Sequence, residues 1–266
     1  MEEDLYGELT PEEVDEYLAY IGLTRAEVPM TVEGLDLLVQ HHARKVPFEN
    51  VDLADGRCAT PSLGVHNMFE RIVHQHKGGY CFMVNGAFNY LLKGLGFEVY
   101  SVMAKIVFAL PVRGFYSHRG NVVTIDGRKY YVDVGMGGRA PDAAIPVPSD
   151  QEHARDSFYI EAQEDGYLLM FAEDGKPRAW FRDLPAINED FLPQHYYLSA
   201  RKESTFTQPL RINLRTDCGN VTVQGDVFTV NCSGESTERT LTREEIPDVL
   251  EQYFGIPRAS LPPEML

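Results

Sequence analysis

The spacing of hydrophobic residues changes near Gly96 and divides the chain into two kinds of structure. Up to that point, apolar residues recur every three or four positions, which is typical of amphipathic helices. The first such segment opens with Thr10 and Pro11 followed by acidic residues, the usual chemistry of a helix start. This pattern predicts four helices, over residues 10–23, 31–46, 62–76 and 81–96. We therefore expect a small helical bundle over residues 1–95.

Beyond Gly96 the hydrophobic pattern predicts mainly strands. Short apolar or alternating runs are separated by turn signals such as Asp-Gly, which is typical of antiparallel sheet. The first group, expected to form a sheet or barrel over residues 96–185, comprises 97–110, 120–125, 129–135, 157–163 and 167–173. A connecting helix is predicted over 188–200 and a capped terminal helix over 242–256, with further strands at 210–216, 220–225 and 227–233.

Composition and net charge exclude some classes of binding partner and indicate a cellular compartment. The chain has 266 residues, 44% of them hydrophobic, and a formal charge of −16. An acidic chain is a poor partner for nucleic acid or an anionic membrane, so neither is expected. We see no secretory signal and no apolar run long enough for a membrane span, so we expect a cytoplasmic protein. Four cysteines without a Cys-x-x-Cys pair are then expected to be four reduced thiols.

A predicted hairpin brings a histidine near an aspartate. Asp126-Gly127 between two apolar runs is a strong signal for a two-residue turn. In that register Asp133 lies opposite Gly120, and His118 is on the same face of the sheet, two positions away. Such diagonal neighbours are close enough for an imidazole and a carboxylate to meet. The flanking apolar residues imply that Asp133 is buried and needs a partner.

Cys81 lies at the predicted start of the fourth helix, after Gly78 and Gly79. A helix N-terminus favours a thiolate, and glycines allow close approach of a substrate. A lone cysteine in an apolar segment is more often inert core, which is our interpretation of Cys58, Cys218 and Cys232. The combination of a cysteine at a helix start with a His–Asp pair favours a nucleophilic role for Cys81, in the order Cys81, His118, Asp133.

These motifs resemble those of the arylamine N-acetyltransferase family. "KGGYCFMVN" matches its nucleophile motif, "PFEN" (residues 47–50) is intact, "VDVGMG" (132–137) matches its Asp motif, and "STFTQPL" (204–210) resembles the start of its last domain. The resemblance implies an α+β fold with a cysteine-protease-like core: a helical bundle (1–95), an antiparallel β-barrel (96–185), and an interdomain helix with an α/β lid (186–266). It implies ping-pong transfer of an acetyl group from acetyl-CoA, a co-substrate with no permanently bound cofactor, to a small aromatic amine.

The resemblance also assigns supporting residues and exposes two departures. The family's Arg before the two glycines is Lys77 here, and its Glu after Cys-Phe is Met83. Because that Arg pairs with the Glu of "PFEN", we expect a Lys77–Glu49 ion pair, looser because lysine lacks the bidentate fork. Candidate substrate contacts are Phe48 and Phe206 for the amine, and Gly135, Gly137, Ser204 and Thr207 for the acyl-CoA. We expect a monomer or a homodimer.

Three alternatives remain open at this point. The same fold could use another donor or acceptor, such as malonyl-CoA or the amide closure of a polyketide chain. A transglutaminase- or papain-like thiol hydrolase shares the Cys, His, Asp order. A zinc site made by His74, His76 and Cys81 is a weaker alternative, because His-x-His is a weak signal, so no metal is expected.

Overall fold

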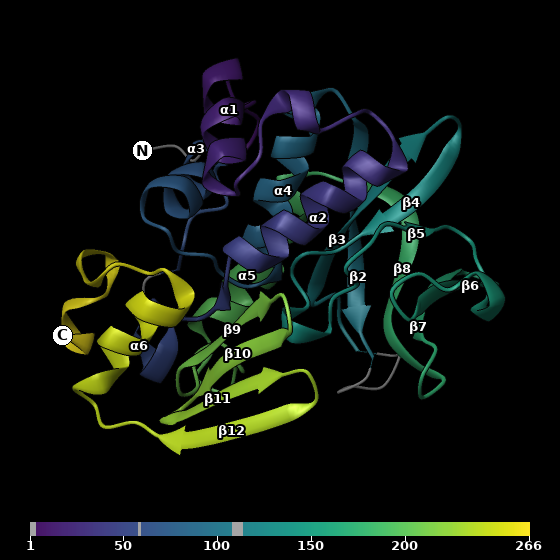
Figure 1. Ribbon diagram of the computed structural model, residues 1–266. Coiled ribbons are helices and arrows are strands. Elements are labelled where there is room, and N and C mark those ends of the chain that lie inside the picture. The colour runs from purple at the N-terminus through teal and green to yellow at the C-terminus, as the bar shows by residue number, and fades with distance from the viewer. Residues whose placement is uncertain (1–3, 58–59, 108–113) are drawn as a thin grey trace.

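The structure, a computed structural model, describes residues 4–57, 60–107 and 114–266 (Figure 1). Its helices confirm the predicted ones in position: α1 (Pro11–Tyr20), α2 (Val32–Lys45), α3 (Val65–Phe69), α4 (Cys81–Leu95), α5 (Asn188–Ala200) and α6 (Glu245–Phe254). One difference is that the third predicted helix is not α-helical throughout. After α3 the chain continues as a π-helical turn over Glu70–His74, with Gln75 N–H donating to the Glu70 carbonyl at 3.0 Å.

A seven-stranded antiparallel sheet forms the centre of the molecule and curls into a nearly closed barrel. Its order is β5-β4-β3-β2-β8-β7-β6. The strands are β2 (Glu98–Ile106), β3 (His118–Ile125), β4 (Arg128–Val132), β5 (Ile145–Pro146), β6 (Phe158–Gln163), β7 (Gly166–Phe171) and β8 (Lys176–Ala186). The predicted hairpin register is confirmed, with Ile125 opposite Arg128 and Asn121 opposite Val132. The predicted strand at 97–110 ends at Ile106, and its residues 108–110 lie outside the described part.

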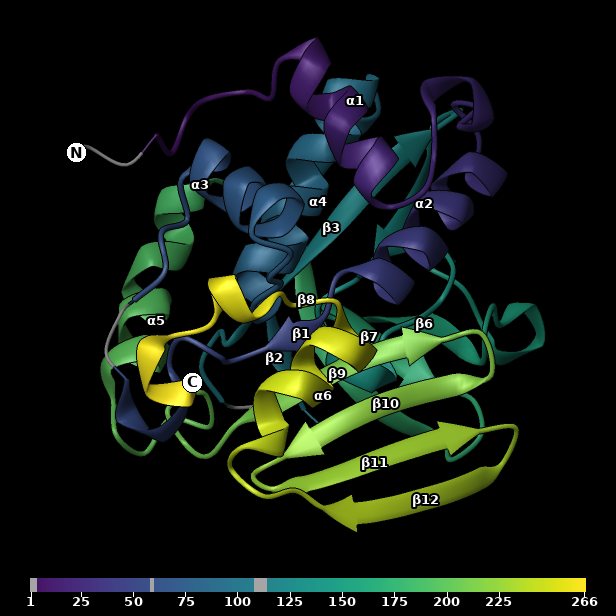
Figure 2. The same cartoon turned by 60° about the vertical axis from the view of Figure 1, so that its left-hand side comes forward.

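A second, five-stranded sheet belongs mainly to the C-terminal part, with the order β1-β9-β10-β11-β12. Its strands are β1 (Phe48–Glu49), β9 (Arg211–Thr216), β10 (Gly219–Gln224), β11 (Val227–Cys232) and β12 (Glu235–Thr240). Figure 2 shows α6 against one face of this sheet, where its apolar side chains share a buried cluster with those of β9 and β10. The sequence analysis missed β12, because this exposed edge strand has no apolar residue to mark it.

The expectation of four reduced thiols is wrong for two of them. Cys218 and Cys232 form a disulfide, with Cα atoms 4.7 Å apart. The strand register explains the pairing, since Cys232 lies opposite Gly219, directly after Cys218, across β10 and β11. Among the described residues only Cys81 is a free cysteine, and it is buried. Cys58 lies outside the described residues.

The helical part and the barrel meet along α4. One continuous buried cluster joins the apolar faces of α1–α4 to the outer, helix-facing residues of β3 and β4, including Val123 and Val132. A smaller cluster fills the barrel behind Tyr131 and Phe181. Because α4 packs against β3, its first residue is held next to the barrel strands that carry His118.

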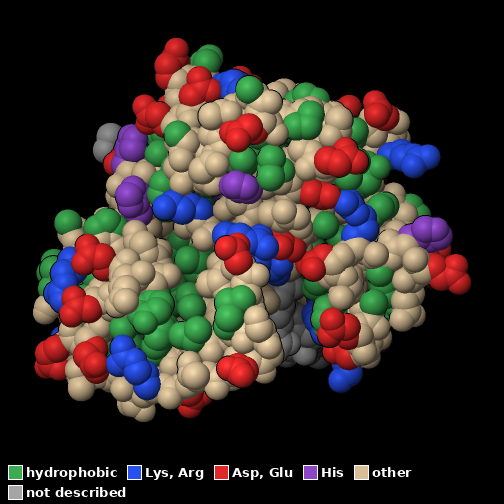
Figure 3. Space-filling model, viewed as in Figure 1, with side chains coloured by type: hydrophobic (Ala, Val, Ile, Leu, Met, Phe, Trp, Pro, Cys, Tyr) green, Lys and Arg blue, Asp and Glu red, His purple; other side chains and the backbone are tan. Residues whose placement is uncertain are grey.

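No helix in the described part of the chain is long and apolar enough to cross a lipid bilayer. Acidic side chains are spread over the face shown in Figure 3, and basic ones near its centre lie beside acidic ones. The ion pairs of Arg44 and Arg215 with Asp142 are examples of such pairing. On this face the described basic side chains are interspersed with acidic ones, whereas nucleic-acid binding favours clustered lysine and arginine.

Candidate active site

The loop before Cys81 is fixed by the "PFEN" segment. Phe48 of β1 bridges Gly79, and the Glu49 N–H donates to the Gly79 carbonyl at 3.0 Å. Gly78 and Gly79 are required by this approach. A Cβ on Gly78 would lie 1.6 Å from the Pro47 carbonyl oxygen, and Gly79 has a φ of +149° with Met83 packed against it. The two motifs thus form one small structure around the nucleophile.

Cys81 is the first residue of α4, and its neighbour Tyr80 has the extended backbone of an N-cap, without a side-chain capping bond. No side chain of the N-cap therefore occupies the N–H groups of the first helical turn, which face the space next to Cys81. The thiol is 3% exposed and lies 3.5 Å from the Ser117 carbonyl oxygen, at the start of β3. This location confirms that Cys81 begins the predicted helix and places it beside His118.

His118 and Asp133 form the buried pair that the hairpin register predicts. His118 Nε2 lies 2.5 Å from Asp133 Oδ2, and both side chains are at most 2% exposed. The remaining ring nitrogen, Nδ1, is not used by Asp133, and the Cys81 sulfur is near enough to the ring to raise the pKa of His118. The structure brings Cys81, His118 and Asp133 together, in an arrangement that can activate a thiol.

The charges of this array hold the histidine in its protonated form. Burial lowers the pKa of His118, but the Asp133 carboxylate and the Cys81 sulfur raise it to about 10. Burial alone would raise the pKa of Asp133, yet the His118 imidazolium and hydrogen bonds from Asn85 and the Gly135 N–H lower it. At neutral pH the site therefore contains an imidazolium paired with the Asp133 carboxylate.

Asn85 was part of a matched motif but was not among the predicted site residues, and it locks the carboxylate in place. Its Nδ2 donates to Asp133 Oδ1 at 2.9 Å and to the Arg119 carbonyl at 2.6 Å, while its Oδ1 accepts from the Val134 N–H. Asn85 is one helical turn after Cys81, so it faces the same side of α4. That spacing is the signal that could have identified it.

The expected Lys77–Glu49 ion pair does not form. Glu49 pairs instead with Arg71, from the π-helical turn, and the Arg71 guanidinium also contacts Asp52 and, at 2.6 Å, the Gly78 carbonyl. Lys77 pairs with Asp52, with Nζ 2.8 Å from Oδ1. Arg71 therefore joins three groups through its three guanidinium nitrogens, namely Glu49, Asp52 and the Gly78 carbonyl, whereas Lys77 contacts only Asp52 among them.

We predict that this network makes a large contribution to stability. Arg71→Met leaves Glu49, whose side chain is fully buried, without its cation, which is expected to reduce the free energy of unfolding by about 3–5 kcal/mol. Lys77→Met is the matched control, because Asp52 keeps Arg71 and the loss should be much smaller. Urea unfolding followed by circular dichroism measures both variants. Equal losses in the two variants would contradict the central position of Arg71.

The two predicted aromatic contacts are neighbours beside the nucleophile loop. The rings of Phe48 and Phe206 have centroids 6.2 Å apart, and Phe206 stacks on Tyr80 at 4.2 Å. The sequence analysis missed the next layer. The Tyr80 hydroxyl lies 2.5 Å from Nδ1 of the buried His195 on α5, whose Nε2 reaches the Pro61 carbonyl oxygen. Both predicted phenylalanines are partly buried on this aromatic stack, which gives an apolar wall near Cys81.

The predicted Gly135 and Gly137 lie at the site, whereas the hydroxyl groups of Ser204 and Thr207 form hydrogen bonds within their own turn. A Cβ on Gly135 would come within 2.9 Å of the Cys81 Cα, and Gly137 has a φ of +63° beside the Phe48 ring. The hydroxyl of Ser204 accepts from the Phe206 N–H, and that of Thr207 donates to the Arg201 carbonyl at 2.7 Å. The observed contacts of Ser204 and Thr207 shape their own turn.

The histidines of the zinc alternative do not gather around Cys81. His74 lies within ion-pair distance of Glu70 and Glu16, and the ring of His76 packs on Tyr20. In the described ranges, no three side chains of the metal-ligating types are grouped so that they could hold an ion.

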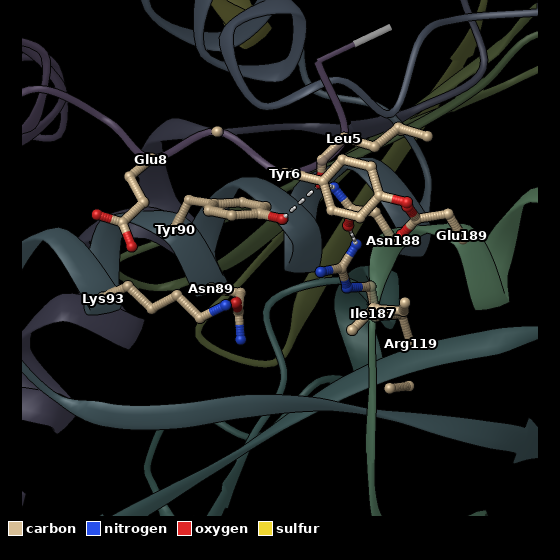
Figure 4. Close-up of a pocket in the computed structure, with 12 residues that line it drawn as sticks. Leu5, Tyr6, Glu8, Asn89, Tyr90, Lys93, Arg119, Ile187, Asn188 and Glu189 are labelled. Carbon is tan, nitrogen blue, oxygen red and sulfur yellow. Dashed lines mark hydrogen bonds between the residues drawn. The ribbon is translucent and has the colours of Figure 1, made fainter.

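A separate small cavity of about 170 Å³ lies behind β3, on the face opposite His118 (Figure 4). Arg119 lines it and is held by neutral groups, with Nε donating to Ser101 Oγ and Nη1 to Asn188 Oδ1. Lys93 also lines the cavity, and so do Glu8 and Glu189, so its charged side chains balance and do not favour an anion. None of the predicted site residues contributes to it.

Comparison with known proteins places this geometry in a family. A family model described as N-acetyltransferase matches residues 31–260. Arylamine N-acetyltransferase 1 of Homo sapiens is 28% identical, covering 92% of this chain and 94% of that protein. An arylamine N-acetyltransferase of Mycolicibacterium smegmatis is also 28% identical, covering 90% of each chain. The structure of Mycobacterium marinum arylamine N-acetyltransferase in complex with CoA has a TM-score of 0.81 at 24% identity, covering 95% of this chain and 98% of that one, and shares its fold.

Proposed function

Because the chain belongs to the N-acetyltransferase family, we propose that it transfers an acetyl group from acetyl-CoA to an arylamine or arylhydrazine through a thioester on Cys81. The observation that carries the proposal is the buried array at the head of α4, in which His118 lies between Asp133 and the free thiol of Cys81. The relatives named as arylamine N-acetyltransferases, one of them solved with CoA, support the choice of acceptor and donor.

In the first half-reaction, the Cys81 sulfur attacks the thioester carbonyl and the CoA sulfur leaves. The imidazolium of His118 supplies the proton that the leaving thiolate takes up, and Asp133 keeps the ring oriented through Nε2. The Met83 N–H already donates to the Tyr80 carbonyl at 2.9 Å, so the N–H groups of Cys81 and Phe82 at the head of α4 are the candidate donors to the oxyanion.

In the second half-reaction, the amine attacks the acetyl carbonyl of the thioester. The neutral His118 left by the first step accepts the amine proton, and the Cys81 thiolate leaves as the amide forms, which restores the starting charges. The partly buried wall made by Phe48 and Phe206 is the place that we assign to the aromatic ring of the acceptor. Gly135 allows its backbone to pack closely against the Cys81 Cα, and Gly137 lies beside the Phe48 ring.

Intact-mass spectrometry after mixing with acyl-CoA tests the proposal. Acetyl-CoA is expected to add about 42 Da, one acetyl group replacing one hydrogen. Adding an arylamine should then remove the adduct and produce the amide. Preferential labelling by malonyl-CoA would point to a different donor, and loss of the adduct to water at an unchanged rate without any amine would indicate a thiol hydrolase. No labelling by any acyl-CoA would overturn the proposal.

A further inference from the structure

Asp133 has a hydrogen-bond donor that neither the motif nor the triad accounts for. The hydroxyl of Tyr131 donates to Asp133 Oδ2 at 2.8 Å, and this is the same oxygen that pairs with His118 Nε2. The other oxygen, Oδ1, accepts from Asn85 Nδ2 and from the Gly135 N–H, both at 2.9 Å. The carboxylate therefore accepts four hydrogen bonds, and two of them compete for the oxygen that faces the catalytic ring.

We propose that Tyr131 is a positioning residue that tunes the His118–Asp133 pair by donating to the same carboxylate oxygen. A donor to Oδ2 withdraws negative charge from that atom and makes it a weaker acceptor for the His118 Nε2–H. It also fixes the plane of the carboxylate, and with it the orientation of the imidazole. The imidazolium is thereby kept acidic enough to give its proton to the leaving group.

The surroundings of Tyr131 are built to hold its hydroxyl in this place. Its side chain is fully buried on β4, and its ring stacks on Phe181 with centroids 4.7 Å apart. The ring passes directly over Gly120 of β3, where a Cβ would lie 2.4 Å from the Tyr131 Oη. The glycine and the tyrosine thus fit each other across the hairpin. Burial, followed by the Asp133 charge, raises the pKa of Tyr131 well above its usual value, so the hydroxyl remains a donor.

The sequence contains the signal for this contact. Tyr131 and Asp133 are two positions apart at the end of one strand, so their side chains share a face of the sheet. Tyr131 lies opposite Val122, and Gly120 is the next residue on that face of β3. A residue with a hydroxyl two positions before the aspartate, diagonal to a glycine on the neighbouring strand, predicts the second donor to Oδ2.

Tyr131→Phe is the direct test, because it removes the hydroxyl and keeps the ring that stacks on Phe181. The resonance of the His118 Nε2 proton, assigned by its loss in Asp133→Asn, is expected to move downfield as Oδ2 becomes a stronger acceptor. Tyr167→Phe is the matched control, since Tyr167 stacks on the same Phe181 ring at 5.5 Å without contacting Asp133. It should leave the resonance where it is in the wild-type protein.

A second measurement, 3-fluorotyrosine incorporation into the wild-type protein, does not depend on how well the Tyr131→Phe variant folds. Incorporation of 3-fluorotyrosine makes each phenol more acidic and a stronger donor, so the His118 resonance is expected to move upfield, opposite to the effect of Tyr131→Phe. The same incorporation into Tyr131→Phe should cause no such shift.

The kinetic consequence rests on the proposed function. In Tyr131→Phe the acylation rate by acetyl-CoA is expected to fall about 3- to 10-fold with the KM for acetyl-CoA unchanged, the scale of a typical single hydrogen bond. An unchanged resonance and rate in Tyr131→Phe, or the same shift in Tyr167→Phe, would show that Tyr131 only packs. Absence of any acyl-enzyme in the wild-type protein would overturn the proposed function, while the resonance would still test Tyr131.

Discussion

Cys81→Ala is expected to lose the acetyl adduct completely and to reduce amide formation by about 10⁵-fold or more, as removal of a catalytic nucleophile does. Cys81→Ser should be almost as inactive, because a hydroxyl in the same place is much harder to deprotonate than a thiol. The reason is structural. Cys81 is the free cysteine beside the His118 imidazole, and the head of α4 offers no second nucleophile among the described residues.

Intact mass and a steady-state transfer assay measure this loss. The matched control is the double variant Cys218→Ser with Cys232→Ser, which removes the disulfide on β10 and β11 and should keep the adduct on Cys81. Circular dichroism verifies that each variant is folded. An adduct of normal size in Cys81→Ala would place the acyl group on another residue and refute the role assigned to Cys81.

Asp133→Asn is expected to have the second-largest effect, a fall in the acylation rate of about 10³- to 10⁴-fold, the scale seen when the orienting carboxylate of a triad becomes an amide. The amide removes the charge that balances the imidazolium, whereas burial of His118 remains and lowers its pKa. The pKa of His118 is therefore expected to fall from about 10, because burial still lowers it and only the Cys81 sulfur still raises it. A smaller fraction of the ring is then protonated at neutral pH and able to supply a proton to the leaving group.

Single-turnover acylation kinetics and NMR titration of the His118 ring measure these two effects separately. Asp126→Asn is the matched control, since Asp126 is the exposed turn residue of the same hairpin and asparagine also tolerates its left-handed conformation. It should leave both the rate and the titration unchanged. If Asp133→Asn left the pKa of His118 unchanged, the carboxylate would not be the source of the raised pKa.

The catalytic geometry could be predicted from the sequence because it depends on local rules. A two-residue turn at Asp126-Gly127 fixes the register, and parity along the strands then determines that His118 and Asp133 share a face. The start of α4 at Cys81 follows from the glycines before it and the apolar stripe after it. Turn type and helix periodicity are decided within a few residues, so no knowledge of the complete fold was required.

The brace of Glu49 and the disulfide could not be predicted in this way, because each depends on distant packing. Arg71 reaches Glu49 only because the helix after Phe69 becomes a π-helical turn, which the apolar spacing of residues 62–76 does not reveal. Cys218 meets Cys232 through the register of β10 with β11, which cysteine spacing along the sequence does not reveal. The sequence suggested Lys77 as the partner of Glu49 and reduced thiols for Cys218 and Cys232. The tertiary contacts instead pair Glu49 with Arg71 and join the two cysteines.

The two-residue strand β1 has a consequence for how the parts of the molecule move. On one side Phe48 pairs with Asn213 of β9, and on the other it bridges Gly79, two residues before the nucleophile. The C-terminal sheet and the loop that precedes Cys81 are therefore hydrogen-bonded to the same short segment, which transmits a displacement of either one to the other. A ligand whose binding depends on the acylation state of Cys81 through this segment would shift the equilibrium of acylation, and by thermodynamic linkage acylation of Cys81 would change the affinity for that ligand by the same factor.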